Sequence, residues 1–135
     1  PLYAKLYQAG LINKTFGLDF ESNSETAHFV FGGESSNPAA VTEAILNEGV
    51  RIAWNGLDEA AFRRARRAEY GARVRALNSF DHLCIQIAKG HFAGYQYLDF
   101  AALYDQITRQ EVEELLRDSI TGTRSALSIV NPKGV

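Results

Sequence analysis

The stretch TFGLDFESNSETAHFVFGG, residues 15–33, decides the fold class of this chain. Apolar and polar residues alternate on both sides of a turn at Ser22-Asn23-Ser24. The apolar positions are Phe16, Leu18 and Phe20 before the turn, and Ala27, Phe29 and Phe31 after it. A period of two is typical of a strand with one apolar face. The sequence therefore predicts a β-hairpin of residues 15–21 and 26–32, whose apolar face needs a cover.

Helical patterns lie on both sides of this hairpin. Before it, Leu2, Leu6 and Ala9 recur at helical spacing, and Gly10 predicts where that helix ends. After it, Asn37-Pro38 predicts the start of a helix that ends at Gly56, because proline at the first helical position loses no needed hydrogen bond. Its buried stripe is predicted at Val41, Ile45 and Ile52. Further helices are predicted at residues 58–77, from Phe80 to about Gly90, at about 99–106, and from the capping box Thr108 to Glu111 as far as Ile120.

The last periodic stretch, RSALSIV at residues 124–130, predicts a third strand that ends before Asn131-Pro132. The predicted fold class is α+β, an antiparallel β-hairpin plus a C-terminal strand covered by several helices. Residues 1–135 are predicted to form a single domain that is the C-terminal part of a larger domain, because a three-stranded sheet is thin for this length. We expect an unpaired sheet edge, and therefore self-association of the chain.

The composition indicates an ordinary globular protein. The chain has 135 residues, of which 46% are hydrophobic and 22% are charged. Its net charge of −2 argues against nucleic acid as a partner, and no apolar run approaches the roughly 18 residues of a membrane span. The single cysteine excludes an internal disulfide and fits a cytoplasmic location. Because the chain starts at Pro1 and contains no methionine, we expect it to be a fragment.

The titratable residues predict neither a catalytic nor a metal-binding centre. His28, His82 and His91 have no second histidine or glutamate three or four positions later, so HExxH and HxxEH motifs are absent from the sequence. We expect His28 to be half-buried in a strand and the other two histidines to lie on helix surfaces. Cys84 falls on the apolar side of its helix, which predicts a buried structural thiol rather than a nucleophile.

Two of the predicted helices carry clusters of charged side chains. The carboxylates Glu113, Glu114 and Asp118 are expected on the solvent side of their helix. An arginine run is the more notable feature, with six arginines in 13 positions: Arg63, Arg64, Arg66, Arg67, Arg73 and Arg75. It predicts a solvated helix face, or one that pairs with acidic groups of another domain. The alternative is a nucleic-acid stripe, but alanine is the most frequent residue between the arginines, which leaves little aromatic surface for stacking.

The order of these elements and five local phrases resemble the insulinase/pitrilysin-type peptidases, the inverzincin group that includes mitochondrial processing peptidase. The phrases are LYQAGLINKTFGLDF, ETAHFVFGGESSNPAAVTEAI, GLDEAAFRRARRAEYGARVRALNS, LYDQITRQEVEELLRDSI and ALSIVNP, and together they cover essentially the whole chain. Within that family the chain looks most like the bacterial two-domain subgroup. The resemblance implies a LuxS/processing-peptidase-like metallohydrolase domain.

The resemblance also implies a function. Such enzymes are zinc metallopeptidases that carry an HxxEH helix in their N-terminal half, so this chain resembles the C-terminal, non-zinc half, which encloses the peptide substrate. Its implied partner is an N-terminal zinc-bearing half or subunit, and the alternative is an inactive homologue acting as a scaffold or regulatory subunit. Active relatives place an arginine and a tyrosine where Ala4 and Leu11 stand here, so no substrate-binding residue is assigned, and neither are catalytic or metal residues.

Overall fold

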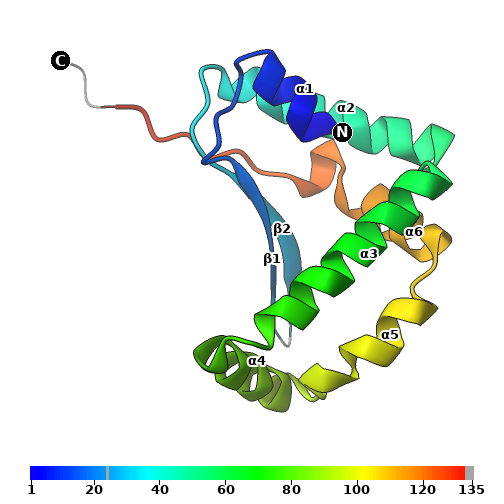
Figure 1. Ribbon diagram of the computed structural model, residues 1–135. Helices are drawn as coiled ribbons and strands as arrows, with labels where there is room; N and C mark the ends of the chain where they lie inside the picture. The colour runs from blue at the N-terminus through cyan, green and yellow to red at the C-terminus, as the bar shows by residue number, and fades with distance from the viewer. Residues whose placement is uncertain (24, 133–135) are drawn as a thin grey trace. The chain divides into compact units, whose positions relative to one another are not determined.

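The computed structural model describes residues 1–23 and 25–132, and its elements confirm the α+β class (Figure 1). The helices are α1 (Leu2–Gln8), α2 (Pro38–Asn55), α3 (Glu59–Ala76), α4 (Phe80–Ala93), α5 (Phe100–Gln106) and α6 (Arg109–Ser119). The strands are β1 (Gly17–Ser22) and β2 (Ala27–Gly32), and two short 3-10 helices are η1 (Tyr97–Asp99) and η2 (Gly122–Arg124). Ser24 of the predicted turn lies outside the described residues.

The chain divides into two compact units. The first unit contains Pro1–Gly56 and the described residues from Glu114 onward, and the second unit contains Leu57–Glu113. The boundary therefore follows α2 on one side and falls inside α6 on the other.

The predicted hairpin is confirmed in the first unit. Strands β1 and β2 pair antiparallel, with Leu18 opposite Phe31 and Phe20 opposite Phe29. The apolar side chains thus share one face, as the alternation predicts. The turn is held by Asn23, whose side-chain oxygen accepts hydrogen bonds from the backbone N–H of Glu25 at 2.9 Å and of Thr26 at 2.8 Å. Asparagine favours turns because its side chain can replace a backbone acceptor in this way.

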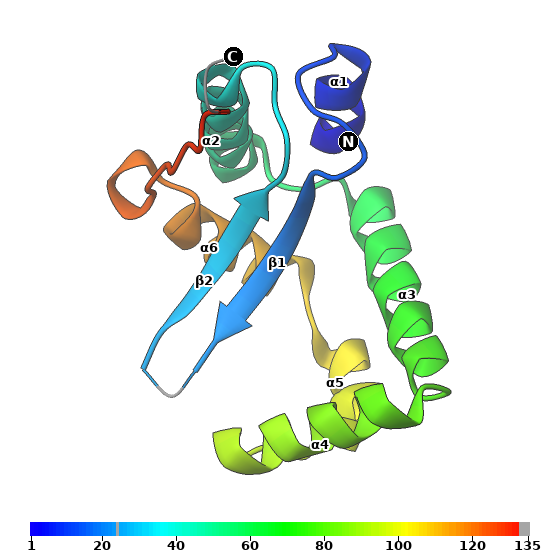
Figure 2. The same ribbon diagram turned by 90° about the vertical axis from the view of Figure 1, so that its left-hand side faces the viewer.

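The apolar face of the hairpin stays largely uncovered, which corrects the expectation that helices cover it. Leu18 is 59% exposed and Phe20 is 54% exposed. Within the first unit the two strands extend away from α1 and α2, so that only the base of the hairpin reaches these helices (Figure 2). Phe16, just before β1, packs against the core there. Beyond the base of the hairpin, α1 and α2 therefore do not cover its apolar face.

The core of the first unit forms where α1 and α2 pack together. Its buried residues are Leu6, Ile12 and Val41, at 5%, 5% and 4% exposure. The predicted stripe on α2 is confirmed, since Ile52 is buried as well and Ile45 is partly buried. The caps of α2 are also as predicted: the Asn37 side chain accepts a hydrogen bond from the Ala40 N–H at 3.1 Å, and Gly56 ends the helix with a φ of +69°.

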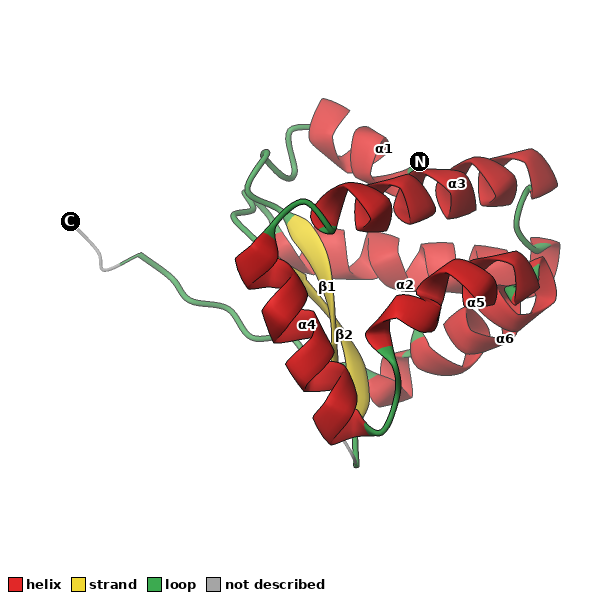
Figure 3. Cartoon of the chain, turned by 60° about the horizontal axis from the view of Figure 1, so that its bottom comes forward, coloured by secondary structure: helices red, strands yellow, loops and turns green. Residues whose placement is uncertain are grey.

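The prediction of a third strand at residues 124–130 is wrong. Gly122–Arg124 form η2, and the following residues run as a chain without sheet pairing (Figure 3). The backbone at Ser125 is extended, with φ −123° and ψ 148°. A strand is defined by hydrogen bonds to a neighbour, and the sheet in the described part of the chain contains β1 and β2 alone. Apolar residues do alternate in this stretch, but no strand pairs with it in the described part of the chain.

The second unit is built from α3, α4 and α5, and its predicted helix starts are confirmed. The Asp58 side chain accepts a hydrogen bond from Ala61 N–H at 2.7 Å, and the Ser79 hydroxyl accepts one from His82 N–H at 3.4 Å. The buried residues Tyr97 and Phe100 form an aromatic cluster with two neighbouring tyrosines, Tyr70 and Tyr104. Among the residues described, none of the helices is both long and apolar enough to cross a membrane.

Candidate functional site

The first candidate site is a shallow cleft at the base of the hairpin, in the first unit. Two loops line it, the one that follows α1 and the one that follows β2, and its volume is about 320 Å³. The lining residues are Gly10, Leu11, Ile12, Asn13, Glu34, Ser35 and Ser36. Most of the lining is therefore backbone, small hydroxyl groups, one amide and one carboxylate.

The loop after α1 takes its shape from Gly10. The N–H of Leu11 donates a hydrogen bond to the carbonyl of Leu6 at 3.0 Å, and the N–H of Gly10 donates one to the carbonyl of Tyr7 at 3.0 Å. This pair of bonds is the Schellman motif, which requires the residue after the C-cap to have a positive φ. Gly10 has a φ of +67°, a conformation that glycine adopts without steric cost.

The two loops are fastened to each other by polar contacts. Asn13 is the central residue: its side-chain oxygen accepts hydrogen bonds from Thr15 N–H at 2.8 Å and from the Thr15 hydroxyl at 2.6 Å, while its amide donates to Glu34 at 2.6 Å. Across the cleft, the Ser35 hydroxyl donates to the carbonyl of Leu11 at 2.7 Å. These bonds hold the two loops together and make the rim of the cleft polar.

The structure also places the two positions where the family resemblance implies substrate contacts. Leu11 lines the cleft and packs against the core of the first unit. Ala4 is a partly buried residue of α1. Neither side chain can donate or accept a hydrogen bond, so any binding at this cleft would rely on the backbone, Asn13 and Glu34.

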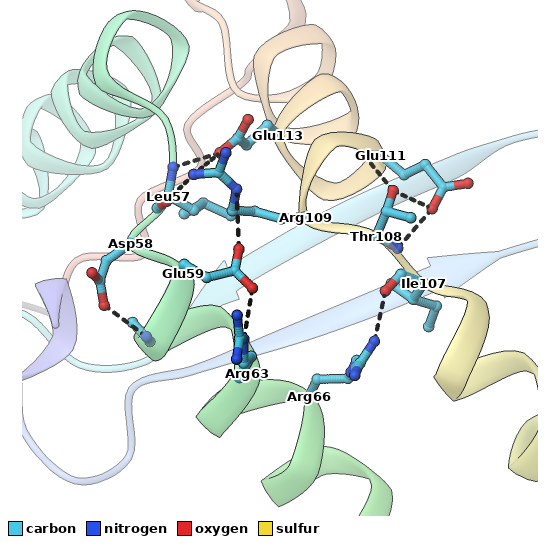
Figure 4. Close-up of polar contacts among 11 residues, drawn as sticks. Leu57, Asp58, Glu59, Arg63, Arg66, Ile107, Thr108, Arg109, Glu111 and Glu113 are labelled. Atoms are coloured by element: carbon cyan, nitrogen blue, oxygen red, sulfur yellow. Dashed lines mark hydrogen bonds and ion pairs between the residues drawn. The ribbon is translucent and has the colours of Figure 1, made fainter.

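A second polar cluster joins the start of α3 to the start of α6 within the second unit (Figure 4). Glu113 accepts a hydrogen bond from the Leu57 N–H at 2.7 Å, and Arg109 donates one to the Leu57 carbonyl at 2.8 Å. Arg109 also lies 3.5 Å from Glu59, which in turn pairs with Arg63 at 2.7 Å. Both backbone groups of Leu57 are thus satisfied by two side chains one helical turn apart.

This cluster corrects the expectation that Glu113 is solvated. Its side chain is only 13% exposed. The spacing of Arg109 and Glu113 is visible in the sequence, but their target, the backbone at Leu57, is 52 to 56 positions away and carries no sequence signal.

Next to the cluster, the predicted capping box is confirmed: the Thr108 N–H donates to Glu111 at 2.8 Å and the Glu111 N–H donates to the Thr108 hydroxyl at 3.3 Å. The Thr108 hydrogen bonds lower the pKa of Glu111.

The arginine run of α3 divides into two groups. Arg66 and Arg73 turn toward the unit's own residues: Arg66 donates to the Ile107 carbonyl at 3.0 Å, and Arg73 lies over the Tyr104 ring, 5.8 Å from its centroid. Burial raises the pKa of Tyr104, and Arg73 opposes that shift. Arg63 pairs with Glu59, whereas Arg64, Arg67 and Arg75 are exposed. Half of the run is therefore structural, and the other half forms a solvated face.

The remaining candidate residues are spread over both units. His28 is exposed, not half-buried, and lies 3.4 Å from Glu21 on the neighbouring strand. His82 and His91 lie on the surface of α4, as predicted. Cys84 is exposed, so the prediction of a buried thiol is wrong: the apolar side of α4 on which it stands is itself left open, as Phe80 and Ile87 are also exposed. Among the described residues, no three metal-ligating side chains come together.

Comparison with known proteins confirms the family resemblance. No family model matches the chain. The chain is homologous to part of a zinc protease: it is 27% identical over 131 residues to the zinc protease YmfH of Bacillus subtilis, an alignment that covers 97% of this chain and 30% of YmfH. Its fold is similar to part of an M16-like peptidase. A peptidase of this kind from Alicyclobacillus acidocaldarius superposes with a TM-score of 0.76 and 22% identity, over 87% of this chain and 28% of that one. The chain thus spans under a third of the length of either relative.

Proposed function

We propose that this chain is a segment of the C-terminal, non-zinc half of a zinc-dependent metallopeptidase, and that it contributes to the wall that encloses the substrate. One observation carries the proposal. Nearly the whole chain aligns with a zinc protease, yet its sequence contains no HxxEH motif and covers only 30% of that relative. The zinc-binding residues are therefore expected in another part of the parent protein.

The chain's own contribution would be structural and polar. The cleft at the base of the hairpin offers backbone groups, Asn13 and Glu34 as hydrogen-bonding partners for an extended peptide. The parent's zinc, held by the N-terminal half, would lower the pKa of a bound water and polarise the scissile carbonyl. The substrates in this proposal are peptides or unfolded chains, and the partner is the zinc-bearing half, in the same chain or in a separate subunit.

A second candidate function is that of an inactive peptidase homologue that acts as a scaffold or regulatory subunit. The identities of Ala4 and Leu11 favour it, since both lack the polar groups that the family resemblance implies at these positions. Co-purification with a separate subunit that contains HxxEH would support this second function.

We further propose that the two units belong to one domain, itself part of a larger one, and that the protein works in the cytoplasm without nucleic-acid or membrane partners. The single cysteine supports the reducing compartment, and the net charge of −2 argues against a polyanion. Retardation of a nucleic-acid duplex at low salt, lost steeply as salt rises, would contradict that part of the proposal.

The decisive experiment is a cleavage assay on an unstructured peptide in the presence of zinc. The 135-residue chain alone is expected to give no turnover, whereas the parent protein, whose upstream sequence should contain HxxEH, is expected to cleave the peptide in a chelator-sensitive way. Turnover by the 135-residue chain alone, abolished by a chelator, would refute the assignment to the non-zinc half. A parent without HxxEH and without an HxxEH partner would refute the peptidase role.

A further inference from the structure

Glu34 is the one charged side chain among the residues that line the cleft at the base of the hairpin. Its carboxylate oxygen Oε2 accepts a hydrogen bond from the Asn13 amide at 2.6 Å. In the described part of the chain, Oε1 has no hydrogen-bond partner, and no lysine, arginine or histidine forms an ion pair with this carboxylate. This holds even for Lys14, which directly follows Asn13 in the sequence. The cleft therefore has a negative charge that the described chain does not compensate.

Hydrogen bonds hold the Glu34 carboxylate and its backbone in place. The Asn13 side chain that binds the carboxylate is itself oriented by the Thr15 N–H at 2.8 Å and the Thr15 hydroxyl at 2.6 Å. The Glu34 N–H donates to the same hydroxyl at 3.3 Å, and a β-bridge between Ile12 and Ser35 joins the two loops. A group that is oriented before binding loses less conformational entropy when its ligand arrives.

The hydroxyl groups of the cleft already donate hydrogen bonds within the protein. The Ser35 hydroxyl donates to the Leu11 carbonyl at 2.7 Å, and the Ser36 hydroxyl donates to the Gly10 carbonyl at 3.0 Å. The backbone N–H groups of Gly10, Leu11 and Ser36 are bonded within the first unit as well. An anionic ligand would thus meet few free donors and a like charge, whereas a cationic donor would meet Glu34.

We propose that this cleft is a subsite for a basic side chain, lysine or arginine, of a peptide substrate, and that Glu34 determines this specificity. The inference rests on the proposed function, in which the same cleft binds an extended peptide. The ammonium or guanidinium group donates a charge-assisted hydrogen bond to the Glu34 carboxylate, and the aliphatic stem of the same side chain contacts Leu11. Asn13 is a positioning residue, because it acts through Glu34.

The expected size of the preference follows from the exposure of the site. Glu34 is exposed, and ion pairs at exposed positions contribute less than about 1 kcal/mol. A peptide with lysine should therefore bind about fivefold more tightly than the same peptide with glutamine at low ionic strength. At about 1 M salt, where the Debye length is about 3 Å, the difference should fall below about twofold.

The test is a chemical-shift titration of the isotope-labelled 135-residue chain with three unstructured peptides. The peptides are capped at both ends, consist of glycine and serine, and differ in a central lysine, glutamine or glutamate. Shifts of the Asn13, Glu34 and Ser36 amides report binding at this cleft. The lysine peptide should bind about fivefold more tightly than the glutamine peptide, and the glutamate peptide should bind most weakly.

Two variants separate Glu34 from the general charge of the first unit. Glu34→Gln keeps an acceptor for the Asn13 amide but removes the charge, so the lysine and glutamine peptides should bind within about twofold of each other. Glu43→Gln is the matched control, because it removes the same charge from an exposed position of α2 that does not line the cleft. It should keep the preference for lysine. The amide spectrum of each variant checks that its fold is retained.

The parent protein gives a second readout where it cleaves peptides. Because Glu34 acts in substrate binding, Glu34→Gln should raise KM for the lysine peptide and leave kcat nearly unchanged. An unchanged KM would overturn the subsite, and so would a lysine preference that survives Glu34→Gln in the titration.

The titration also separates this inference from the proposed function. Equal binding of the lysine and glutamine peptides would overturn the subsite and leave the peptide-binding cleft standing. The absence of any peptide-dependent shift at the cleft would overturn both. Chelator-sensitive cleavage tests the assignment to a zinc peptidase independently of either result.

Discussion

Gly49 gives the sharpest test of how the first unit is packed. It lies in the middle of α2 and is buried. A Cβ added there would lie 2.7 Å from Cγ2 of Ile120 and 2.8 Å from the Ile120 carbonyl oxygen. Carbon atoms do not approach this closely, and the carbonyl belongs to backbone that cannot rotate away. The residues that follow α6 therefore pack directly on the bare backbone of α2.

The expected effect of Gly49→Ala is the balance of two terms. Replacing a helical glycine by alanine ordinarily stabilises a protein by about 0.5–1 kcal/mol. Forcing an extra methyl group into a filled site costs about 1–3 kcal/mol. The net result should be a loss of roughly 1–2 kcal/mol in the free energy of unfolding. Gly71→Ala is the matched control: it is also inside an 18-residue helix, α3, but its nearest neighbour is the flexible end of Arg75 at 3.4 Å.

Urea unfolding gives the free energy of unfolding of both variants and of the wild type. Far-UV circular dichroism reports on all helices, while hydrogen exchange of the α2 amides, followed by mass spectrometry at each urea concentration, reports on the first unit. Comparing the two signals detects any separate unfolding of the units. Gly71→Ala should raise the free energy of unfolding by about 0.5–1 kcal/mol. If Gly49→Ala raises it as well, the close approach of Ile120 to α2 is wrong.

Three further predictions concern single side chains. Gly33→Ala should destabilise the first unit by about 2 kcal/mol or more in urea unfolding, because φ is +146° and the new Cβ would lie 2.8 Å from the Phe16 nitrogen; an unchanged midpoint would contradict it. Glu113→Ala should cost about 1–2 kcal/mol, since the Leu57 N–H loses its acceptor, and Glu113→Gln, which keeps one, should cost less. The lowered pKa of Glu111 means that its contribution to stability is present above the ordinary value of 4.5 and is lost as the pH falls through the lower folded-state value. The melting temperature followed by circular dichroism should therefore drop over that pH range, and Glu111→Gln, whose side chain does not titrate but can still complete the capping box, should lack this part of the drop; an equal drop in both proteins would contradict the prediction.

Local rules accounted for most of the secondary structure. The predicted starts at Asn37, Asp58 and Ser79 are all confirmed, because a capping side chain and the N–H it binds are three residues apart and need no distant partner. The Gly10 helix stop follows from the same kind of local geometry. The cross-strand pairing of Phe20 with Phe29 also follows from short-range alternation across a turn.

The errors arose where a property depends on distant neighbours. Cys84 was predicted to be buried from its position on an apolar helix side, but an apolar side becomes buried only if something packs on it. Glu113 was predicted to be solvated, but it binds a backbone group 56 positions away. In neither case does the local sequence contain the missing information.

The sequence by itself therefore determined the helices, the hairpin and its apolar face, and the family that the chain resembles, because caps, turns and periodicity act over a few residues. The tertiary structure decided which of these surfaces are covered. In the part of the chain that the structure describes, it left most of the hairpin's apolar face exposed and residues 125–130 outside the sheet, and it placed Ile120 against Gly49 and the Arg109–Glu113 pair against Leu57. Burial and strand pairing are properties of two segments at once, and no pattern within one segment specifies the other.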